Sequence, residues 1–176
     1  VKNPLKFNLF LLSRLPAAFF SGLRVSSIDS ESCTVSVPYA WFTRNPFRST
    51  YFACLSMAGE MSTGILAMAQ VYKLKPTVSL LVTGIEGTFH KKATGRTYFT
   101  WRQGDHFREA VEAAMATGEA KQVHAFSTGV NEAGEVVARG AGRGHLGAAG
   151  RDHRARALHG ARPAVDDRRP PPPQGP

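Results

Sequence analysis

The 176-residue sequence lacks the residue clusters that indicate a metal centre or a disulfide-bonded scaffold. Its only cysteines are Cys33 and Cys54, and neither has a histidine or a second cysteine at metal-ligand spacing. His90, His106 and His124 are not at such a spacing either, so we expect no metal site. One cysteine falls in an expected strand and the other in an expected buried helix. We therefore expect two buried free thiols in a reducing, cytoplasmic compartment, with a disulfide between them as the alternative.

Aromatic residues are absent after Phe126, and the composition changes from Arg139 onward. That last segment consists of Ala, Gly, Arg, Pro, His, Asp and Gln with three scattered aliphatic residues. It cannot bury enough apolar surface to offset the entropy of ordering it. The sequence therefore predicts one domain over residues 1–140 and a disordered tail over 141–176. The tail is either a genuine extension or a GC-rich coding sequence read in a shifted frame, which resequencing codons 136–145 would decide.

Acidic residues are scarce, because 13 Asp and Glu stand against 22 Lys and Arg and leave a formal charge of +9. From Arg139 onward there are eight arginines and three aspartates, so this segment supplies +5 of the charge and the rest of the chain +4. A strongly basic protein often binds nucleic acid. Here the domain carries no nucleic-acid-binding motif, so we expect no nucleic-acid partner. Its mild positive charge suits a small molecule that bears phosphate groups.

Proline is absent from residues 51–74, and almost no polar face remains there. A helix that is apolar nearly all round is a buried helix, and this one is long enough to cross a small domain. An Asn-Pro turn at 45–46 precedes it, and Ser49 or Thr50 is expected to cap its first turn. Because Glu60 lies in its middle, we expect no membrane span.

Glu60 is the conspicuous residue of this long helix. A carboxylate among methionines and alanines loses hydration and must be paired, protonated or functional. It lies about three turns into a helix whose open N-terminus can hold an anion or a polarised carbonyl, which favours a functional role. The alternative is a half-exposed glutamate that is hydrogen-bonded to a neighbouring backbone group or hydroxyl.

The remaining patterns predict a covering helix at the N-terminus and hairpins on either side of the long helix. Gly84 and Gly87 lie inside an expected strand, where they indicate bulges, the close approach of a backbone or ligand, or simple curvature. Because hairpin links dominate, the fold class is α+β, with an antiparallel sheet wrapped around the long central helix. Strands are expected over 23–28, 33–38, 78–89, 96–101, 122–130 and 135–138, and further helices over 3–15 and 104–117.

A resemblance to a known family is carried by PAAFFSGLRV at 16–25, NPFRSTYFACLSMAGEMSTGIL at 45–66, GTFHKKATGR at 87–96 and NEAGEVVARG at 131–140. Over nearly all of residues 1–140 the chain resembles the hotdog-fold PaaI-like thioesterases, in the branch that includes the DUF4442 proteins. The resemblance implies hydrolysis of an acyl-CoA thioester by a homodimer or homotetramer with active sites at the subunit interface. It implies no cofactor apart from the coenzyme A of the substrate.

The same resemblance implies a site. In PaaI-like enzymes the central helix carries an acid about two turns in, which Glu60 matches, so Glu60 would position or deprotonate a water. The family's His-Gly-Gly motif is replaced by residues around 50–52, whose backbone N–H groups would hold the thioester oxygen. The substrate-binding candidates are Asn45, Ser49, Thr50, Tyr51, Phe52, Gly84 and Gly87. Candidates for the coenzyme A phosphates are Lys91, Lys92 and Arg96, with a solvated basic loop as the alternative.

Two other functions stay open. The missing His-Gly-Gly motif favours a non-catalytic hotdog protein that binds an acyl or aryl thioester or a lipid, or that serves as an assembly partner. A lipid or steroid carrier is the third hypothesis, although methionines in a helix more often fill a core than line a pocket. Glu60 favours the enzyme, because an acid in an apolar helix costs stability unless it is used.

Overall fold

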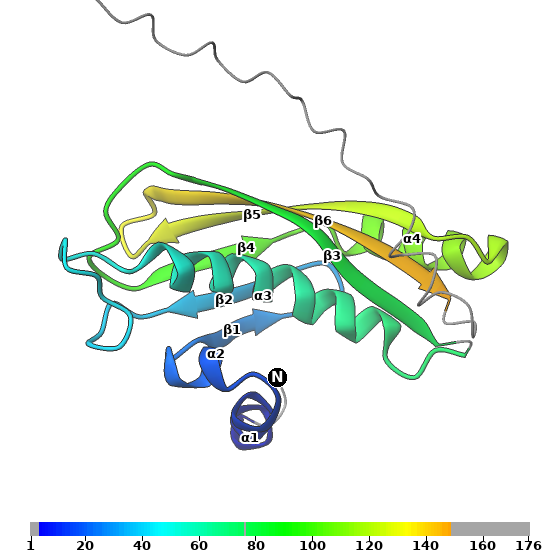
Figure 1. The fold of residues 1–176 in the computed structure, drawn as a ribbon, viewed down its shortest axis with the longest axis horizontal. Coiled ribbons are helices and arrows are strands. Elements are labelled where there is room, and N and C mark those ends of the chain that lie inside the picture. The colour runs from blue at the N-terminus through cyan, green and yellow to red at the C-terminus, as the bar shows by residue number, and fades with distance from the viewer. Residues whose placement is uncertain (1–3, 76, 149–176) are drawn as a thin grey trace, which may run out of the picture.

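The computed structural model describes residues 4–75 and 77–148. Its elements follow the predicted order, with the N-terminal helix interrupted before Pro16 (Figure 1). In chain order they are α1 (Pro4–Arg14), α2 (Pro16–Phe20), β1 (Arg24–Ile28), β2 (Cys33–Val37), α3 (Phe52–Val71), β3 (Val78–Phe89), β4 (Thr97–Trp101), α4 (Gly104–Thr117), β5 (Lys121–Asn131) and β6 (Val136–Ala148).

The six described strands form one antiparallel sheet in the order β1-β2-β4-β5-β6-β3. The sheet curves around α3, which crosses its inner face (Figure 1). A tight turn joins β1 to β2, where the Asp29 carboxylate accepts the backbone N–H groups of Glu31 and Ser32. These observations confirm the predicted α+β class, with an antiparallel sheet wrapped around a long central helix.

The core lies between α3 and the inner faces of the middle strands. β4 alternates, so that Thr97, Phe99 and Trp101 are buried on the face toward α3. A Cβ placed on Gly59 of α3 would meet the Phe99 ring at 3.4 Å, so this glycine lets helix and sheet approach closely. The Trp101 ring meets Phe107 of α4 edge-on at 6.0 Å between centroids, which ties α4 to the same core.

The N-terminal helices lie outside the sheet, next to β1 (Figure 1). Leu11 is fully buried, and Phe7 and Phe10 pack against the core. Leu5 and Leu9 are exposed. A proline at the start of α2 suits the first turn of a helix, where no backbone N–H is needed. The predicted covering helix is thereby confirmed.

β6 is longer than the sequence predicts. It runs to Ala148, and its backbone pairs with β5 along one edge and with β3 along the other. Residues 141–148, which composition assigns to the tail, are therefore the second half of an interior strand. Hydrogen bonds from both neighbours hold the glycine-rich segment extended, although glycine has a poor β propensity. Residues 149–176 lie outside the described part of the chain.

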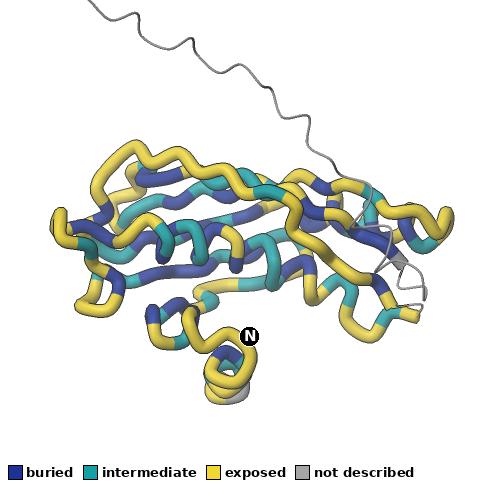
Figure 2. The backbone as a smooth tube through the Cα atoms, in the orientation of Figure 1, coloured by how far each residue is buried: buried dark blue, intermediate teal, exposed yellow. Residues whose placement is uncertain are grey.

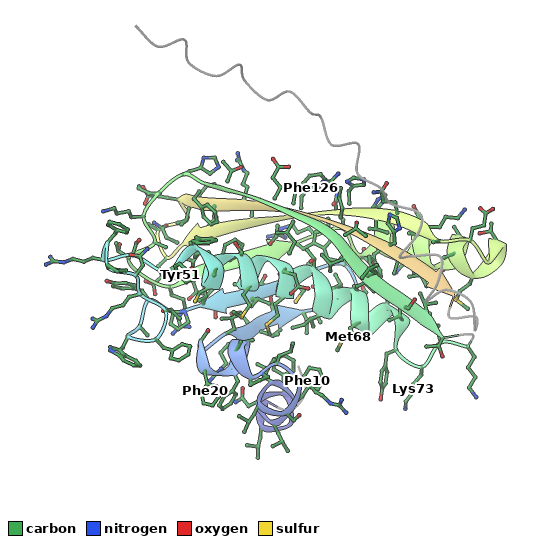
Figure 3. All side chains as sticks on the ribbon, viewed as in Figure 1. Phe10, Phe20, Tyr51, Met68, Lys73 and Phe126 are labelled. Atoms are coloured by element: carbon green, nitrogen blue, oxygen red, sulfur yellow. The ribbon has the colours of Figure 1, made fainter. Side chains whose placement is uncertain are left out.

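α3 is buried along one side only, which corrects the expectation of a helix buried all round. Ala58, Met61 and Leu66 are buried in the core, whereas Phe52 and Met68 are about half exposed. Figure 3 labels Met68 on the second half of α3. By length and composition α3 could also cross a membrane. Its buried residues pack against the sheet, however, as in the core helix of a soluble domain.

β3 forms one edge of the sheet and is exposed along nearly its whole length (Figure 2). Its pairing with β6 shifts between Val82 and Gly84, so Thr83 forms a bulge. This confirms the irregularity predicted at Gly84. At Gly87 the pairing stays regular, with Gly140 opposite.

Candidate active site

A cavity of about 70 Å³ lies between α3 and the inner faces of β3, β5 and β6. It is much smaller than the roughly 300–1,000 Å³ of pockets that enclose a drug-sized ligand, so it could hold only the end of a large substrate. Its walls are mainly apolar. α3 contributes Leu55, Ser56, Gly59, Glu60, Thr63, Gly64 and Ala67, and the inner-face side chains of the sheet include Leu80, Val82, Ile85, Phe89, Phe99, Trp101, Val123, Ala125 and Ser127.

The floor of the cavity is β6, whose inward positions carry almost no side chain. Ser127 of β5 pairs with Gly140, and Ala125 pairs with Gly142. Paired residues of an antiparallel sheet point to the same face, and Ser127 bonds to α3, so both glycines face the helix. A Cβ added at either glycine would meet no atom within 4 Å. The cavity exists because these two positions are empty.

Glu60 stands at the mouth of this cavity, with a carboxyl oxygen 3.0 Å from where a Cβ on Gly64 would lie. By accessible surface the residue is exposed, yet desolvation raises the pKa of its carboxyl above the usual 4.5. The two observations fit a carboxyl that water reaches from one side while apolar atoms surround it on the other. Within residues 4–75 and 77–148 no hydrogen bond or ion pair engages this carboxyl, so the hydrogen bond of the predicted alternative does not form among these residues.

A pair of buried serines fixes α3 on the sheet beside the cavity. The hydroxyls of Ser62 and Ser127 lie 2.8 Å apart, and the Ser62 hydroxyl also donates to the Gly59 carbonyl at 2.7 Å. Ser127 neighbours Gly140 across the β5–β6 ladder. The bond thus sets how far the helix stands above the glycine floor, and with it the position of Glu60.

The first turn of α3 differs from the prediction. Tyr51 is the N-cap residue, and no side chain caps the helix. Ser49 and Thr50 are not caps, because the Thr50 hydroxyl donates to the Ala93 carbonyl and Ser49 bonds to Asn45. The Tyr51 N–H donates to the Thr43 carbonyl at 2.7 Å and cannot hold a substrate oxygen.

The N–H groups available at this helix end are those of Phe52 and its successor. No hydrogen bond involving the N–H groups of Phe52 or Ala53 occurs among the described residues, as expected for the first turn of a helix. The Phe52 N–H group therefore stays a candidate donor to a substrate oxygen. The aromatic rings of Tyr51 and Phe89 pack on the Phe52 ring, at 4.8 and 6.1 Å between centroids.

Asn45 has a local structural role. Its side-chain oxygen accepts the N–H groups of Phe47 and Ser49, and its amide nitrogen donates to the Ser49 hydroxyl. These bonds fold residues 45–49 into a turn in front of α3. The predicted contact between Asn45 and substrate would have to use the hydrogen-bonding capacity that these three bonds leave free in the amide.

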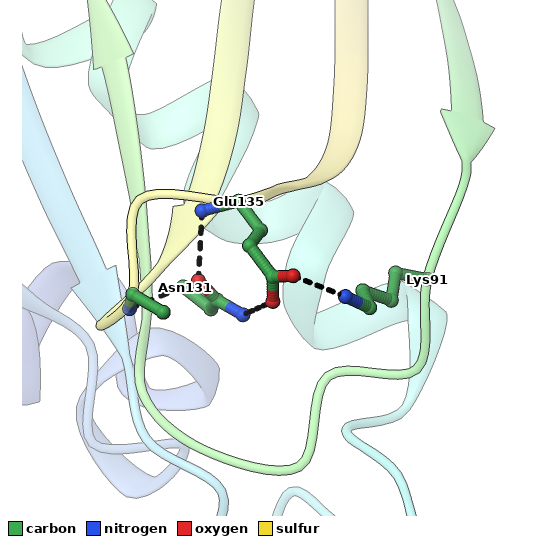
Figure 4. A network of polar contacts seen from close by, with 4 residues as sticks. Lys91, Asn131 and Glu135 are labelled. Atoms are coloured by element: carbon green, nitrogen blue, oxygen red, sulfur yellow. Dashed lines mark hydrogen bonds and ion pairs between the residues drawn. The ribbon is translucent and has the colours of Figure 1, made fainter.

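The basic connection between β3 and β4 is divided in its roles. Lys91 pairs with Glu135 at 2.5 Å, and Asn131 donates to the same carboxylate (Figure 4). This network lowers the pKa of Glu135, chiefly through the Lys91 hydrogen bond. Lys92 lies near the Phe47 carbonyl, and Arg96 is partly buried. The structure thus brings Lys92 next to the loop that precedes α3, whereas Lys91 is held by Glu135.

Neither cysteine fits a catalytic nucleophile. Both are free and buried, which confirms the predicted thiols. Burial raises the pKa of Cys33 to about 11 and also raises the pKa of Cys54, so neither is a thiolate near neutral pH. In the described residues no group of three His, Cys, Asp or Glu side chains could hold a metal ion.

The model of one protein family, a domain of unknown function named DUF4442, matches residues 7–143. The chain belongs to the DUF4442 family. No protein with a curated function matches it.

Solved structures support the hotdog fold of this DUF4442 domain. A protein of unknown function from Pseudomonas aeruginosa is 20% identical with a TM-score of 0.68, covering 84% of this chain and 97% of its own. A thioesterase from the same organism is 14% identical with a TM-score of 0.62 over 82% and 94%. A thioesterase from Haemophilus influenzae is 10% identical with a TM-score of 0.59 over 84% and 94%.

The DUF4442 domain brings only part of the predicted site together. Glu60 and the inner face of β3 around Gly87 line one cavity, whereas Gly84 lies beside the bulge under the Arg143 side chain. Phe52 is eight residues before Glu60 on α3, or about 12 Å along the helix axis. The free N–H groups and the carboxylate therefore cannot act on one carbonyl within a single chain.

Sequence reasoning missed Gly140, Gly142 and Ser127 of the DUF4442 domain. The signal was present, because glycines alternate at 140, 142 and 144 with the period of a strand. Their composition led instead to the assignment of a disordered tail. Ser127 gave no signal of its own, since a serine in a strand is more often a solvent-facing residue.

Proposed function

We propose that this protein is an acyl-CoA thioesterase in which Glu60 activates the hydrolytic water. The observation that carries the proposal is an unpaired carboxylate with a raised pKa at the mouth of an apolar cavity. Hotdog neighbours that are named thioesterases support the same class of reaction. The two buried free thiols fit a cytoplasmic location.

The chemistry follows from the environment of Glu60. A carboxylate with a raised pKa is a stronger base than one with an ordinary pKa, so it can take a proton from a water as that water attacks the thioester carbonyl. The tetrahedral intermediate then collapses, and the carbon–sulfur bond breaks. The leaving thiolate takes up a proton, which the Glu60 carboxyl can return. The products are a carboxylic acid and free coenzyme A.

The oxyanion that forms in this step needs donors which the same α3 cannot bring to it. The Phe52 and Ala53 N–H groups have that capacity, but they lie about 10–12 Å from Glu60 along the helix. A homodimer or homotetramer in which a second copy supplies the other half of the site removes this difficulty. The open surface between α3 and β3 is where a copy could dock, since Phe52, which packs on Phe89 of β3, and Ile85 are more than half exposed there.

Lys92 and Arg96 are the proposed contacts for the coenzyme A phosphates. The β3–β4 connection bonds to the loop before α3 through the Thr50 N–H and the Ala93 carbonyl, at 2.8 Å. Phosphates bound there would lie near the free N–H groups of α3. Lys91 would contribute only if substrate displaced its partner Glu135.

Thiol release from a panel of short, long and aryl acyl-CoAs tests the proposal. Glu60→Gln keeps the shape of the side chain but cannot take up a proton, so we expect turnover to fall by about 10²–10⁴-fold. The matched control is Glu112→Gln, which changes an exposed glutamate of α4 and should leave turnover unchanged. Wild-type turnover that survives in Glu60→Gln would disprove the assigned base.

A binding protein without turnover is the second candidate. The observation that favours it is the first turn of α3, which begins with Tyr51 and Phe52 and lacks the His-Gly-Gly motif of the PaaI-like enzymes that the sequence resembles. Binding of an acyl-CoA by the folded protein, with no thiol released from any member of the panel, would support this candidate.

A further inference from the structure

We propose that Gly140 and Gly142 of β6 form the floor of a slot for an unbranched aliphatic acyl chain, and that Leu80 of β3 sets the length of chain it accepts. The inference rests on the proposed function, because the same cavity would receive the acyl group of the thioester. It adds the class of acyl group and the residues that select it.

The slot follows the direction of β6. At Gly140 and Gly142 a Cβ would meet nothing within 4 Å, so the space above both positions is empty. At Gly144, the next inward position, a Cβ would lie 3.2 Å from the Leu80 Cδ1 atom. The empty space therefore ends where the Leu80 side chain crosses the strand.

The sides of the slot leave room for one narrow chain. Gly142 lies between Ala125 on β5 and Ile85 on β3, which are its direct partners in the sheet. Their Cα atoms are two strand spacings apart, or about 9.5 Å, and their side chains stand on the inner face on either side of Gly142. An extended hydrocarbon fits between these side chains, and we expect a wider group, such as a ring or a branched chain, to fit less well.

The roof is formed by α3, and it places the reacting end of the chain. Gly59, Thr63 and Gly64 line the cavity above the glycine floor, so the roof carries little side-chain volume. Glu60 stands among them at the open mouth. A chain with its thioester near Glu60 would run over Gly140 and Gly142 toward Leu80. Two residues of strand span about 7 Å, which limits the slot to chains of short or medium length.

Binding of S-alkyl-coenzyme A thioethers tests the slot without hydrolysis. The probes are the S-butyl, S-hexyl, S-decyl and S-benzyl compounds, measured by titration calorimetry with the intact protein. For the wild type we expect affinity to rise with chain length and then level off, with S-benzyl weaker than S-hexyl. The chain length at which affinity stops rising, called the plateau below, marks the end of the slot at Leu80.

Two substitutions should move that plateau in opposite directions. Gly142→Leu fills the slot and should weaken S-hexyl binding at least tenfold, the equivalent of about two buried methylenes, while S-butyl changes less. Leu80→Ala opens the far end and should extend the rise to S-decyl. His145→Leu adds the same side chain to an exposed position of β6 that does not line the cavity, and should change nothing. Gly140→Leu serves if Gly142→Leu does not fold.

The outcomes separate this inference from the proposed function. A plateau that stays in place in both folded variants, S-benzyl binding tighter than S-hexyl, or no binding of any probe would overturn the slot. If the protein releases thiol from acyl-CoA thioesters but the plateau is the same in both variants, the thioesterase proposal is supported and the slot is rejected. The predicted plateau shifts in a protein that releases no thiol would support the slot and reject the enzyme.

Discussion

The same substitution should have opposite effects at two glycines on the inner face of neighbouring strands. In Gly142→Ala the added methyl meets no atom within 4 Å, so only the backbone effect of replacing a glycine in a strand remains. That effect stabilises by about 0.5–1 kcal/mol. In Gly129→Ala the methyl would lie 2.6 Å from the Phe99 ring, and overpacking of this kind costs about 1–3 kcal/mol. The two variants should therefore differ by roughly 1.5–4 kcal/mol.

Urea unfolding of both variants and the wild type measures this difference. The protein concentration must be the same in each experiment, because an oligomer gains apparent stability with concentration. Equal slopes against urea would show that the variants unfold from equally compact states. A Gly142→Ala variant that loses as much stability as Gly129→Ala would refute the glycine floor, because position 142 would then be filled.

Two further predictions concern the groups beside the cavity. Ser62→Ala leaves the buried Ser127 hydroxyl without its partner and should cost about 1–3 kcal/mol, whereas adding Ser127→Ala should recover part of this loss, and simple additivity in a double-mutant cycle would contradict it. Glu60→Gln should raise Tm relative to the wild type only above about pH 4.5. Because the pKa of the Glu60 carboxyl is raised in the folded state, the wild-type protein loses stability as pH rises from the ordinary pKa through the raised one. A difference in Tm that stays constant from about pH 4 to pH 8 would argue against this origin.

Periodicity alone predicts most of the fold. The strand over Val78–Phe89 and the helix that ends before Gly118 agree with their predicted bounds, because a period of two residues and a left-handed glycine at the end of a helix are local signals. The fold class follows from the hairpin links. Glu60 could likewise be identified from the sequence, because an acidic residue in an apolar helix stands out without any tertiary information.

Composition alone did not predict the second half of β6. Residues 141–148 are mostly glycine, alanine and arginine, which have no preference for a strand. They are extended because their backbone pairs with β3 on one side and β5 on the other. These two neighbours are brought together only by the tertiary fold. The same holds for Ser49 and Thr50, whose hydroxyls suit a helix cap but bond instead to Asn45 and Ala93. Whether residues 141–176 come from a shifted reading frame stays a prediction.

The sequence also did not predict that α3 and β3 each leave one face exposed. These faces matter for Glu60, because an oligomer that covers them would change the pKa of its carboxyl. A sequence pattern tells how apolar a helix is, but not how many of its sides the chain itself can cover. Here one side of α3 stays open next to the cavity mouth. A second copy that covers this opening would remove water from the Glu60 carboxyl and raise its pKa further.

Association should then depend on pH in one direction. Because the pKa of Glu60 would be higher in the oligomer than in the single chain, the oligomer gains its full stability when the carboxyl is protonated and loses part of it as pH rises through the raised pKa. Sedimentation velocity at several concentrations from about pH 5 to pH 8 should show dissociation increasing with pH. Glu60→Gln should remove most of that dependence, while Glu112→Gln should keep it. An oligomer whose dissociation is the same at every pH in the wild type would mean that the second copy binds elsewhere and that the mouth of the cavity stays open to water.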